Sequence, residues 1–260
     1  MKIIAISNVK GGCGKTSSAV SLGACFAEQK KRVLLIDLDP QMSATQWFGL
    51  QMDSRTLFDV FADDGELKDA VMPSCCEGLD VIPGSRWMLG LDKALANEIG
   101  AEMTLQRKID ALPNQWDIIL LDCPPNTGIA SLSALCAADY LLSPLEPTAL
   151  NTSGLVHMIQ TVQQVQDRLN PKLQILGIVP CRVDRRTKLA KEIIASLRER
   201  FGDLVCRAEI RESVKMKECS SFGIPITEYD PKGTVAADYR ALAKEITKKM
   251  EKHEQVTNRK

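Results

Sequence analysis

The sequence contains little of what several common kinds of active site require. Among its 260 residues there are only two histidines, His157 and His253, and aromatic residues make up 5%. Two histidines argue against a histidine-based zinc site and against a catalytic triad. The formal net charge is zero, with 33 basic and 33 acidic side chains, so no overall field attracts a nucleic acid. Any surface that binds a nucleic acid therefore has to be a local patch of positive charge.

Long apolar runs and regularly paired cysteines are also missing. No segment approaches the roughly 20 apolar residues that span a bilayer, and the N-terminal run IIAI is too short for a signal-peptide core. The nine cysteines are odd in number, irregularly spaced and without a CxxC pair, and the neighbours Cys75 and Cys76 are not expected to bridge each other. We expect most cysteines to be small buried apolar residues of a reduced, cytoplasmic protein.

The chain does have a regular alternation of short apolar segments and longer helical ones. The apolar segments lack clean polar alternation, which is typical of strands covered on both faces. Predicted strands are 2–7, 32–37, 79–84, 116–122, 139–145 and 173–180. Predicted helices are 15–29, 102–112, 128–138, 150–169, 187–201 and 235–252. This order predicts an α/β fold with a mostly parallel, doubly wound sheet flanked by helices, in one domain spanning 1–260.

The segment NVKGGCGKTS, residues 8–17, joins the first predicted strand to the first predicted helix. Its glycines allow a tight turn whose N–H groups, with the helix N-terminus, form a cradle for anions. In such a P-loop Lys15 reaches the β and γ phosphates, the Thr16 hydroxyl binds Mg²⁺ and Ser17 reaches the α phosphate. The strict pattern GxxxxGK[ST] is not met, because Val9 stands where its first glycine belongs.

Carboxylates follow two of the predicted strands. Asp37 and Asp39 lie two residues apart in VLLIDLDPQ, so the alternation of a strand predicts that both face the phosphates. DIILLDCPP is an apolar strand ending in Asp122, the Walker B pattern in which the aspartate holds Mg²⁺. Phosphoryl transfer needs positioning and charge stabilisation more than a strong base, so carboxylates suffice.

The segment KGGCGKT resembles the deviant Walker A motif, KGGxGK[ST], of the ParA/MinD class of P-loop ATPases. Further segments are similar to the Soj/ParA branch: DLDPQMSAT (37–45), LEPTALNTSGL (145–155), VDRRTKLAKEI (183–193) and IRESVKMKECSSFGIPITEYDPKG (210–233). The resemblance covers almost the whole chain and implies an ATPase that uses ATP and Mg²⁺. Because the chain begins almost at its P-loop, we expect no N-terminal helix-turn-helix domain.

The resemblance assigns a role to each candidate residue. Lys10 matches the signature lysine, which in this class reaches across a dimer interface to the partner's nucleotide, and Asp39 matches the aspartate that orients the attacking water. The expected catalytic residues are Lys10, Lys15 and Asp39. The expected nucleotide-binding residues are Lys10, Gly11, Gly12, Cys13, Gly14, Lys15, Thr16, Ser17 and Asp122, and the expected metal ligands are Thr16, Asp39 and Asp122.

Five residues depart from the family pattern, and two of them, Met42 and Ser43, lie in DLDPQMSAT, where the family has DxDPQGNAT. Arg211 stands where the family usually has proline near the adenine, and Glu212 stands where it usually has arginine. The resemblance therefore leaves open which residues contact the adenine base. Cys13 stands in the P-loop where valine is common. Because a helix N-terminus lowers the pKa of a nearby thiol, we predict that a thiol reagent blocks ATP binding, with a buried, inert thiol as the alternative.

A local excess of positive charge lies late in the chain. Between Arg182 and Lys217 there are eleven basic side chains against six acidic ones, a net balance of +5. Such an excess suits phosphate contacts without base readout, although a solvated helix face is the ordinary interpretation. The resemblance to the Soj branch implies nonspecific DNA binding at Arg186 and Lys215, with Arg185 assisting.

The function that the resemblance implies is DNA partitioning. The protein would form an ATP-sandwich homodimer, bind nonspecific double-stranded DNA on the nucleoid, and be released by hydrolysis that a ParB-like centromere-binding protein stimulates. No stable membrane association is expected. Hydrolysis without the partner is expected to be slow, since no arginine finger is identifiable in the sequence.

Three other functions remain open from the sequence. A MinD-like membrane ATPase would use an amphipathic C-terminal helix, but the polar ending HEQVTNRK favours core packing of the apolar stripe found there. That stripe consists of Val235, Tyr239, Leu242, Ile246 and Met250. A metal-cluster ATPase needs interface cysteines, and neither Cys123 nor Cys136 fits that role well. An ATPase that positions a secretion, flagellar or cellulose apparatus is the third.

Overall fold

The computed structural model describes residues 1–51, 57–62, 65–148 and 151–257. Its strands form one sheet in the order β3-β4-β2-β5-β1-β6-β7. The strands are β1 (Lys2–Ile6), β2 (Val33–Asp37), β3 (Met72–Pro73), β4 (Leu79–Ile82), β5 (Ile118–Asp122), β6 (Tyr140–Leu145) and β7 (Gln174–Pro180). Neighbouring strands are parallel except β3, which pairs antiparallel with β4 at one edge.

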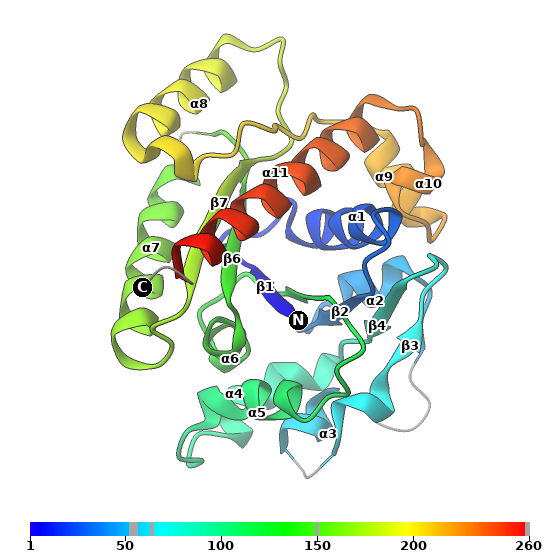
Figure 1. Ribbon diagram of the computed structural model, residues 1–260, viewed down its shortest axis with the longest axis vertical. Coiled ribbons are helices and arrows are strands. Elements are labelled where there is room, and N and C mark those ends of the chain that lie inside the picture. The colour runs from blue at the N-terminus through cyan, green and yellow to red at the C-terminus, as the bar shows by residue number, and fades with distance from the viewer. Residues whose placement is uncertain (52–56, 63–64, 149–150, 258–260) are drawn as a thin grey trace.

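Helices cover both faces of this sheet (Figure 1). They are α1 (Lys15–Glu28), α2 (Ser43–Trp47), α3 (Leu57–Ala62), α4 (Leu91–Ala94), α5 (Thr104–Asp110), α6 (Ile129–Ala137), α7 (Asn151–Arg168), α8 (Lys188–Phe201), α9 (Lys215–Ser221), α10 (Ile226–Tyr229) and α11 (Thr234–Thr257). Helices α1 and α11 pack together on one face, and α4, α5 and α6 lie on the other (Figure 1). Short 3₁₀ turns are η1 (Leu67–Ala70), η2 (Arg86–Gly90), η3 (Ala101–Met103) and η4 (Gly202–Leu204).

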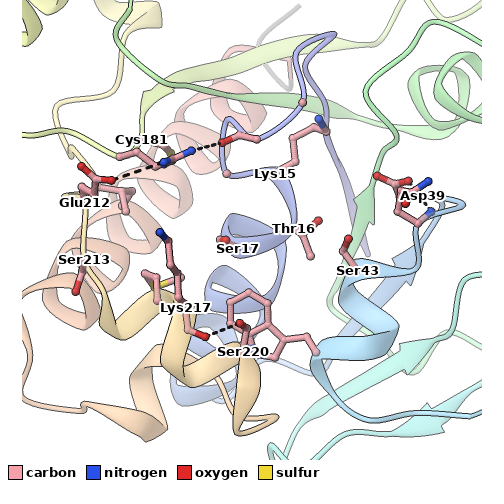
Figure 2. A pocket seen from close by; sticks show the side chains of 18 of the residues that line it. Lys15, Thr16, Ser17, Asp39, Ser43, Cys181, Glu212, Ser213, Lys217 and Ser220 are labelled. Carbon is pink, nitrogen blue, oxygen red and sulfur yellow. Dashed lines mark hydrogen bonds and ion pairs between the residues drawn. The ribbon is translucent and has the colours of Figure 1, made fainter.

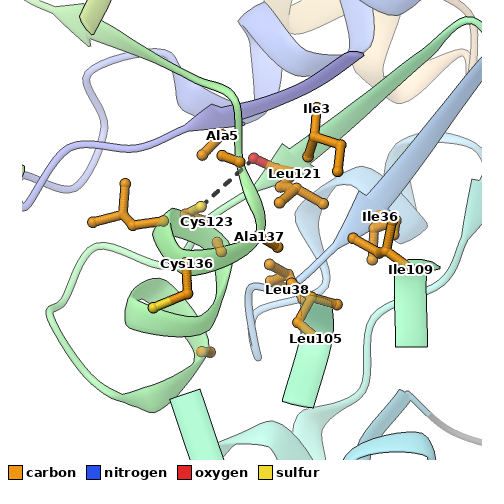
Figure 3. Packing of buried hydrophobic residues seen from close by; sticks show 14 of the residues in the cluster. Ile3, Ala5, Ile36, Leu38, Leu105, Ile109, Leu121, Cys123, Cys136 and Ala137 are labelled. Carbon is orange, nitrogen blue, oxygen red and sulfur yellow. Dashed lines mark hydrogen bonds between the residues drawn. The ribbon is translucent and has the colours of Figure 1, made fainter. Parts of the chain in front are cut away.

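The alternation of side chains along each strand divides the core into two layers. In β1, Ile3 and Ala5 belong to the layer under α4, α5 and α6, whereas Ile4 and Ile6 belong to the layer under α1 and α11. Both layers are apolar, which explains why the strand segments show no polar alternation. Cys123 and Cys136 pack within the first layer (Figure 3), where the Cys123 thiol donates to the Leu121 carbonyl at 3.6 Å.

The fold class, the six predicted strands and the six predicted helices are confirmed to within a few residues. Residue 150, where one predicted helix begins, lies outside the described residues. The segment 102–112 begins as the 3₁₀ turn η3 before it becomes α5. The edge strand β3 was not predicted, because two residues, one of them Pro73, carry no strand pattern, although an edge strand tolerates proline. The short helices α2, α3, α4, α9 and α10 were not predicted either.

The apolar stripe of the C-terminal helix is part of the core. All five of its residues are buried, and α11 packs against α1. This confirms core packing and removes the feature on which a membrane-binding helix would depend. Among the described residues, no helix is both long and apolar enough to cross a membrane.

Candidate functional site

Two glycines in the left-handed region shape the P-loop between β1 and α1. Gly12 has φ 73° and Gly14 has φ 96°, conformations that other L-residues rarely adopt. A Cβ on Gly14 would also meet the Cys181 Cβ at 3.4 Å. Helix α1 begins at Lys15 without a side-chain N-cap, so the N–H groups of its first turn are open to an anion.

The amine of Lys15 lies inside this loop. The residue is only 6% exposed, and its Nζ donates to the Lys10 carbonyl at 2.8 Å. Asn8 holds the loop in place: its Oδ1 accepts from the Lys10 N–H at 3.1 Å, and its Nδ2 donates to the Pro144 carbonyl at 2.7 Å. A buried ammonium group beside free backbone N–H groups makes this loop suitable for phosphate.

Two carboxylates meet beside the P-loop because β2 and β5 are neighbours in the sheet. Asp37 ends β2 and lies opposite Asp122, which ends β5. Asp122 is fully buried, and neither of its oxygens has a hydrogen-bond partner among the described residues. Burial, followed by the charge of Asp37, raises the pKa of Asp122 well above its usual range, and the nearby Thr16 hydroxyl offsets only part of that rise. Burial also raises the pKa of Asp37 to about 6.

The structure separates Asp37 and Asp39, which the two-residue spacing predicts to face the same way. Strand β2 ends at Asp37, so the alternation does not extend to Asp39. The Asp37 carboxylate accepts from the Thr45 N–H at 2.9 Å, the Thr45 Oγ1 at 2.7 Å and the Asp39 N–H at 3.2 Å. It anchors the loop that carries Asp39, whose own Oδ1 accepts from the Gln41 N–H at 2.9 Å.

These residues form a set of hard oxygen donors. Asp122 offers two unpaired carboxylate oxygens, Thr16 a hydroxyl at the start of α1, and Asp39 a further carboxylate at the wall of the adjacent cavity. Mg²⁺ prefers oxygen ligands, and a divalent cation would offset the crowding of negative charge that Asp37 and Asp122 produce. The three expected metal ligands therefore fit Mg²⁺.

We expect Asp122→Asn to stabilise the fold in Mg²⁺-free buffer. The pKa values of Asp37 and Asp122 rise on folding, so the folded state binds these protons more tightly, and stability falls as the pH rises from the unfolded value of 3.8 through about 6. Removing one buried charge should raise the free energy of unfolding near neutral pH by ~1–3 kcal/mol and flatten its pH dependence. Urea unfolding from about pH 5 to about pH 8 measures both quantities.

The matched control is Asp167→Asn, which removes an exposed carboxylate from α7. It should change the free energy of unfolding by no more than about 0.5 kcal/mol. An Asp122→Asn protein that is less stable than the wild type at every pH would show that the buried charge is not the destabilising feature.

A cavity of about 1030 Å³ opens over the P-loop (Figure 2). Its volume is in the range of sites for cofactors and small molecules. Seven of the expected site residues line it: Gly11, Gly12, Gly14, Lys15, Thr16, Ser17 and Asp39. Lys10, Cys13 and Asp122 are not part of this lining. In Figure 2, Lys15, Thr16 and Asp39 lie around one space, and Lys217 and Ser220 of α9 form another wall.

Cys13 lacks the properties expected of a reactive thiol. It is 1% exposed, its Sγ donates to the Lys10 carbonyl at 3.3 Å, and burial raises its pKa despite the nearby Lys15. The expectation of a lowered pKa is wrong, because desolvation of the thiolate outweighs the favourable charge. The structure supports the alternative of a buried thiol, which should react slowly with thiol reagents.

Sequence reasoning missed Arg182, which lies against the P-loop. Its φ is 54°, and its Nη1 donates to the Gly12 carbonyl at 3.1 Å. The guanidinium also lies 3.7 Å from Glu146 and 3.6 Å from Glu212, and Figure 2 marks the contact that Glu212 makes. In the sequence, Arg182 stood out only as the first residue of the basic segment that was interpreted as a DNA-binding surface. Its position beside the cavity is evident only from the tertiary structure.

The departures at Arg211 and Glu212 are explained by contacts within the chain. The Arg211 guanidinium donates to the two Asp238 oxygens at 2.7 and 2.6 Å and to the Thr234 carbonyl at 3.0 Å. These bonds tie the segment before α9 to α11. Glu212 pairs with Arg182, as described above. Both departing residues line the cavity, so they form a fixed and charged part of its wall.

The three expected DNA-binding residues are all exposed and all ion-paired. The partners are Glu209 for Arg185, at 3.6 Å, Asp184 for Arg186, at 2.8 Å, and Asp230 for Lys215, at 2.6 Å. Arg186 is the most exposed, with 90% of its side chain accessible. A groove of about 420 Å³ is lined by Arg185, Arg186 and Lys217, but not by Lys215. The structure thus brings the two arginines together with Lys217 and leaves Lys215 apart.

Comparisons with known proteins identify relatives over most of the chain. The model of a family described as AAA domain matches residues 1–175. The chain is 38% identical over 247 residues to the sporulation initiation inhibitor protein Soj of Bacillus subtilis (strain 168), covering 94% of this chain and 98% of Soj. It is 34% identical over 250 residues to the chromosome partitioning protein ParA of Myxococcus xanthus (strain DK1622), covering 95% of this chain and 88% of that protein.

The fold is also found among solved structures. Cobyrinic acid a,c-diamide synthase from Mycobacterium smegmatis, with bound ADP and magnesium, matches with a TM-score of 0.82 and 30% identity, covering 94% of this chain and 93% of that one. The mostly parallel sheet with its P-loop after β1 is the P-loop NTPase fold. From these likenesses over nearly its whole length, the chain belongs to the ParA/Soj family of P-loop ATPases.

Proposed function

We propose that this chain is a single-domain DNA-partitioning ATPase, which binds ATP with Mg²⁺, pairs with a second copy while ATP is bound, and holds nonspecific DNA in that state. The observation that carries the proposal is the cavity where the P-loop, Lys15 and Asp39 lie around one space. The similarity to the Myxococcus xanthus chromosome partitioning protein supports the function, and the ADP and magnesium of the synthase support the ligands.

The site residues divide the work of hydrolysis among them. The N–H groups of the P-loop and the Lys15 amine bind the β and γ phosphates. Thr16 and Asp122 would hold Mg²⁺, which would supply positive charge to neutralise the phosphates. Asp39 accepts a hydrogen bond from the attacking water and orients it toward the γ phosphorus. The water oxygen bonds to phosphorus as the bond to the β–γ bridging oxygen breaks. ADP keeps that electron pair, and the proton of the water passes to the phosphate.

Lys10 serves the nucleotide of the second copy. Its main-chain carbonyl accepts from Lys15 and Cys13, while its side chain does not line the cavity of its own chain. Two ATP molecules at one interface bring a large negative charge together, and a lysine supplied by the other subunit neutralises it. Dimer formation then depends on bound ATP.

DNA lies on the groove that Arg185, Arg186 and Lys217 line. The Arg186 side chain of its ion pair with Asp184 is 90% exposed, so exchange of that carboxylate for a DNA phosphate loses little. Dimerisation doubles the number of phosphates that the protein can bind, which makes DNA binding depend on ATP. A centromere-binding protein of the ParB type stimulates hydrolysis and so releases the DNA.

We expect Arg186→Glu to weaken binding of the ATP-bound protein to nonspecific duplex DNA by about tenfold or more at low salt. The change replaces an attraction to phosphate by a repulsion in each subunit, and the salt slope should fall by about 1 for each phosphate that is no longer neutralised. Fluorescence anisotropy with a labelled duplex measures the affinity. The matched control is Arg168→Glu, an exposed residue at the end of α7, which should bind as the wild type does. Unchanged affinity of Arg186→Glu would disprove the assignment.

The proposed function itself is tested by DNA binding with ATP, with ADP and without nucleotide, each at two salt concentrations. Binding that requires ATP and weakens with salt supports it. If ATP is hydrolysed but DNA is not bound in any nucleotide state, the ATPase acts on a different cargo. Co-sedimentation with liposomes then tests a membrane as that cargo.

A further inference from the structure

Cys75 is an exposed exception among cysteines that are otherwise buried. It neighbours Cys76 in the turn between β3 and β4, and the two Sγ atoms lie 3.9 Å apart. Glu228 of α10 brings a carboxylate oxygen, so that the three possible ligand atoms all lie within 4.8 Å of one another. In the part of the chain that the structure describes, no other group of three cysteine, histidine or carboxylate side chains is close enough to share a metal ion.

We propose that Cys75, Cys76 and Glu228 form a binding site for Zn²⁺. In tetrahedral zinc sites the Zn–S distance is about 2.3 Å, so two sulfurs on one ion lie about 3.8 Å apart. The sulfurs of Cys75 and Cys76 are already at nearly that separation. Three protein ligands leave the fourth position to water. Because thiolates select zinc rather than magnesium, the site does not compete for the Mg²⁺ of the nucleotide.

The thiols are held in place before any ion binds. The Ser74 Oγ accepts from the Cys76 N–H at 3.0 Å and donates to the Leu79 carbonyl at 2.6 Å, which fixes the turn. The Cys75 thiol donates to the Gly223 carbonyl at 3.4 Å, so the turn already touches the segment that leads to Glu228. Ligands positioned in this way need little rearrangement to bind a metal, and the exposed Cys75 gives the ion a path from solvent.

The site joins two segments that are distant in sequence. The turn lies at the edge of the sheet, and Glu228 follows α9, whose Ser220 and Ser221 line the cavity (Figures 1 and 2). A bound ion would hold the end of α9 against the sheet edge. The proposal rests on the geometry of the ligands and is independent of the proposed function.

The test is zinc binding by the reduced full-length protein. After loading with Zn²⁺ and desalting, we expect one zinc per chain by elemental analysis, and Co²⁺ in its place should give a thiolate-to-cobalt charge-transfer band. Loss of a supporting residue alone weakens metal sites about 10–100-fold, so loss of a ligand in Cys75→Ser or Glu228→Gln should weaken binding by about 100-fold or more. Both changes are at exposed residues, and an unaltered melting temperature without metal confirms that the variants fold.

The matched control is Cys136→Ala, which removes a thiol from the opposite core layer (Figure 3). It should bind zinc and cobalt as the wild type does. The proposal is overturned if the wild type retains no zinc, or if Cys75→Ser and Glu228→Gln bind as tightly as the wild type. Zinc binding that is lost in Cys136→Ala but kept in Cys75→Ser would also overturn it.

Discussion

Lys10→Ala is expected to weaken ATP-dependent binding to nonspecific DNA by about 100-fold or more, equivalent to ~2.7 kcal/mol, while ATP itself binds within a few-fold of the wild type. The hydrogen bonds that Lys10 makes inside the P-loop come from its main chain, so alanine keeps them. Alanine removes only the side-chain charge that, in the proposed function, neutralises the nucleotide of the second subunit. Equilibrium binding of a fluorescent ATP analogue measures ATP affinity, sedimentation of the ATP-bound protein measures dimer formation, and fluorescence anisotropy measures DNA binding.

Two further variants serve as controls for this result. Lys15→Ala should abolish ATP binding itself, because that amine lies within the cavity of its own chain. Lys172→Ala removes an exposed lysine before β7 and should behave as the wild type in all three assays. If Lys10→Ala still dimerises with ATP, or if it loses ATP binding as Lys15→Ala does, then Lys10 does not act across an interface.

Asp39→Ala is expected to lower the rate of ATP hydrolysis by about 10²–10³-fold while ATP-dependent DNA binding persists or lasts longer. Removal of one group that stabilises or positions the reacting atoms has effects of this size. In the proposed function other residues bind ATP and DNA, so the variant should accumulate in its DNA-bound state. Phosphate release and DNA dissociation, followed on the same preparation, measure the two effects.

Asp39→Asn distinguishes the effect of losing the negative charge from the effect of disturbing the loop that carries Asp39. Asparagine keeps an oxygen that accepts from the Gln41 N–H, so the loop should hold its shape while the charge is gone. We expect hydrolysis by this variant to be nearly as slow as that of Asp39→Ala. Hydrolysis close to the wild-type rate in either variant would move the water-positioning role to another residue.

The elements that the sequence predicted well are those that depend on short local patterns. Apolar runs of five to seven residues gave the central strands, because a strand covered on both faces needs apolar residues at every position. The P-loop was recognisable from its glycines and Gly-Lys-Thr between a predicted strand and a predicted helix, and the structure places Gly12 and Gly14 in the left-handed region. The edge strand β3 and the short helices α2, α3, α4, α9 and α10 were not predicted, because their few residues carry no comparable pattern.

The site residues that the sequence did not identify depend on contacts between distant segments. Arg182 lies 170 residues from Gly12 in the chain, yet it donates to the Gly12 carbonyl. The spacing of basic residues did not reveal that Lys217, and not Lys215, shares a groove with Arg186. Such contacts depend on how the segment after β7 and α9 pack on the sheet, which no short window of sequence contains.

The sequence alone determined the class of the fold, the order of its central strands and helices along the chain, and the residues of the P-loop and the Walker B strand, because these follow from local periodicity and from glycine conformations. Only the tertiary structure decided which groups meet. Burial raises the pKa of Asp37, of Asp122 and of the Cys13 thiol, and the pairing of β2 with β5 places Asp37 opposite Asp122, where its charge raises the pKa of Asp122 further. Proximity and burial are set by the packed chain as a whole, and they determine the electrostatics of this site.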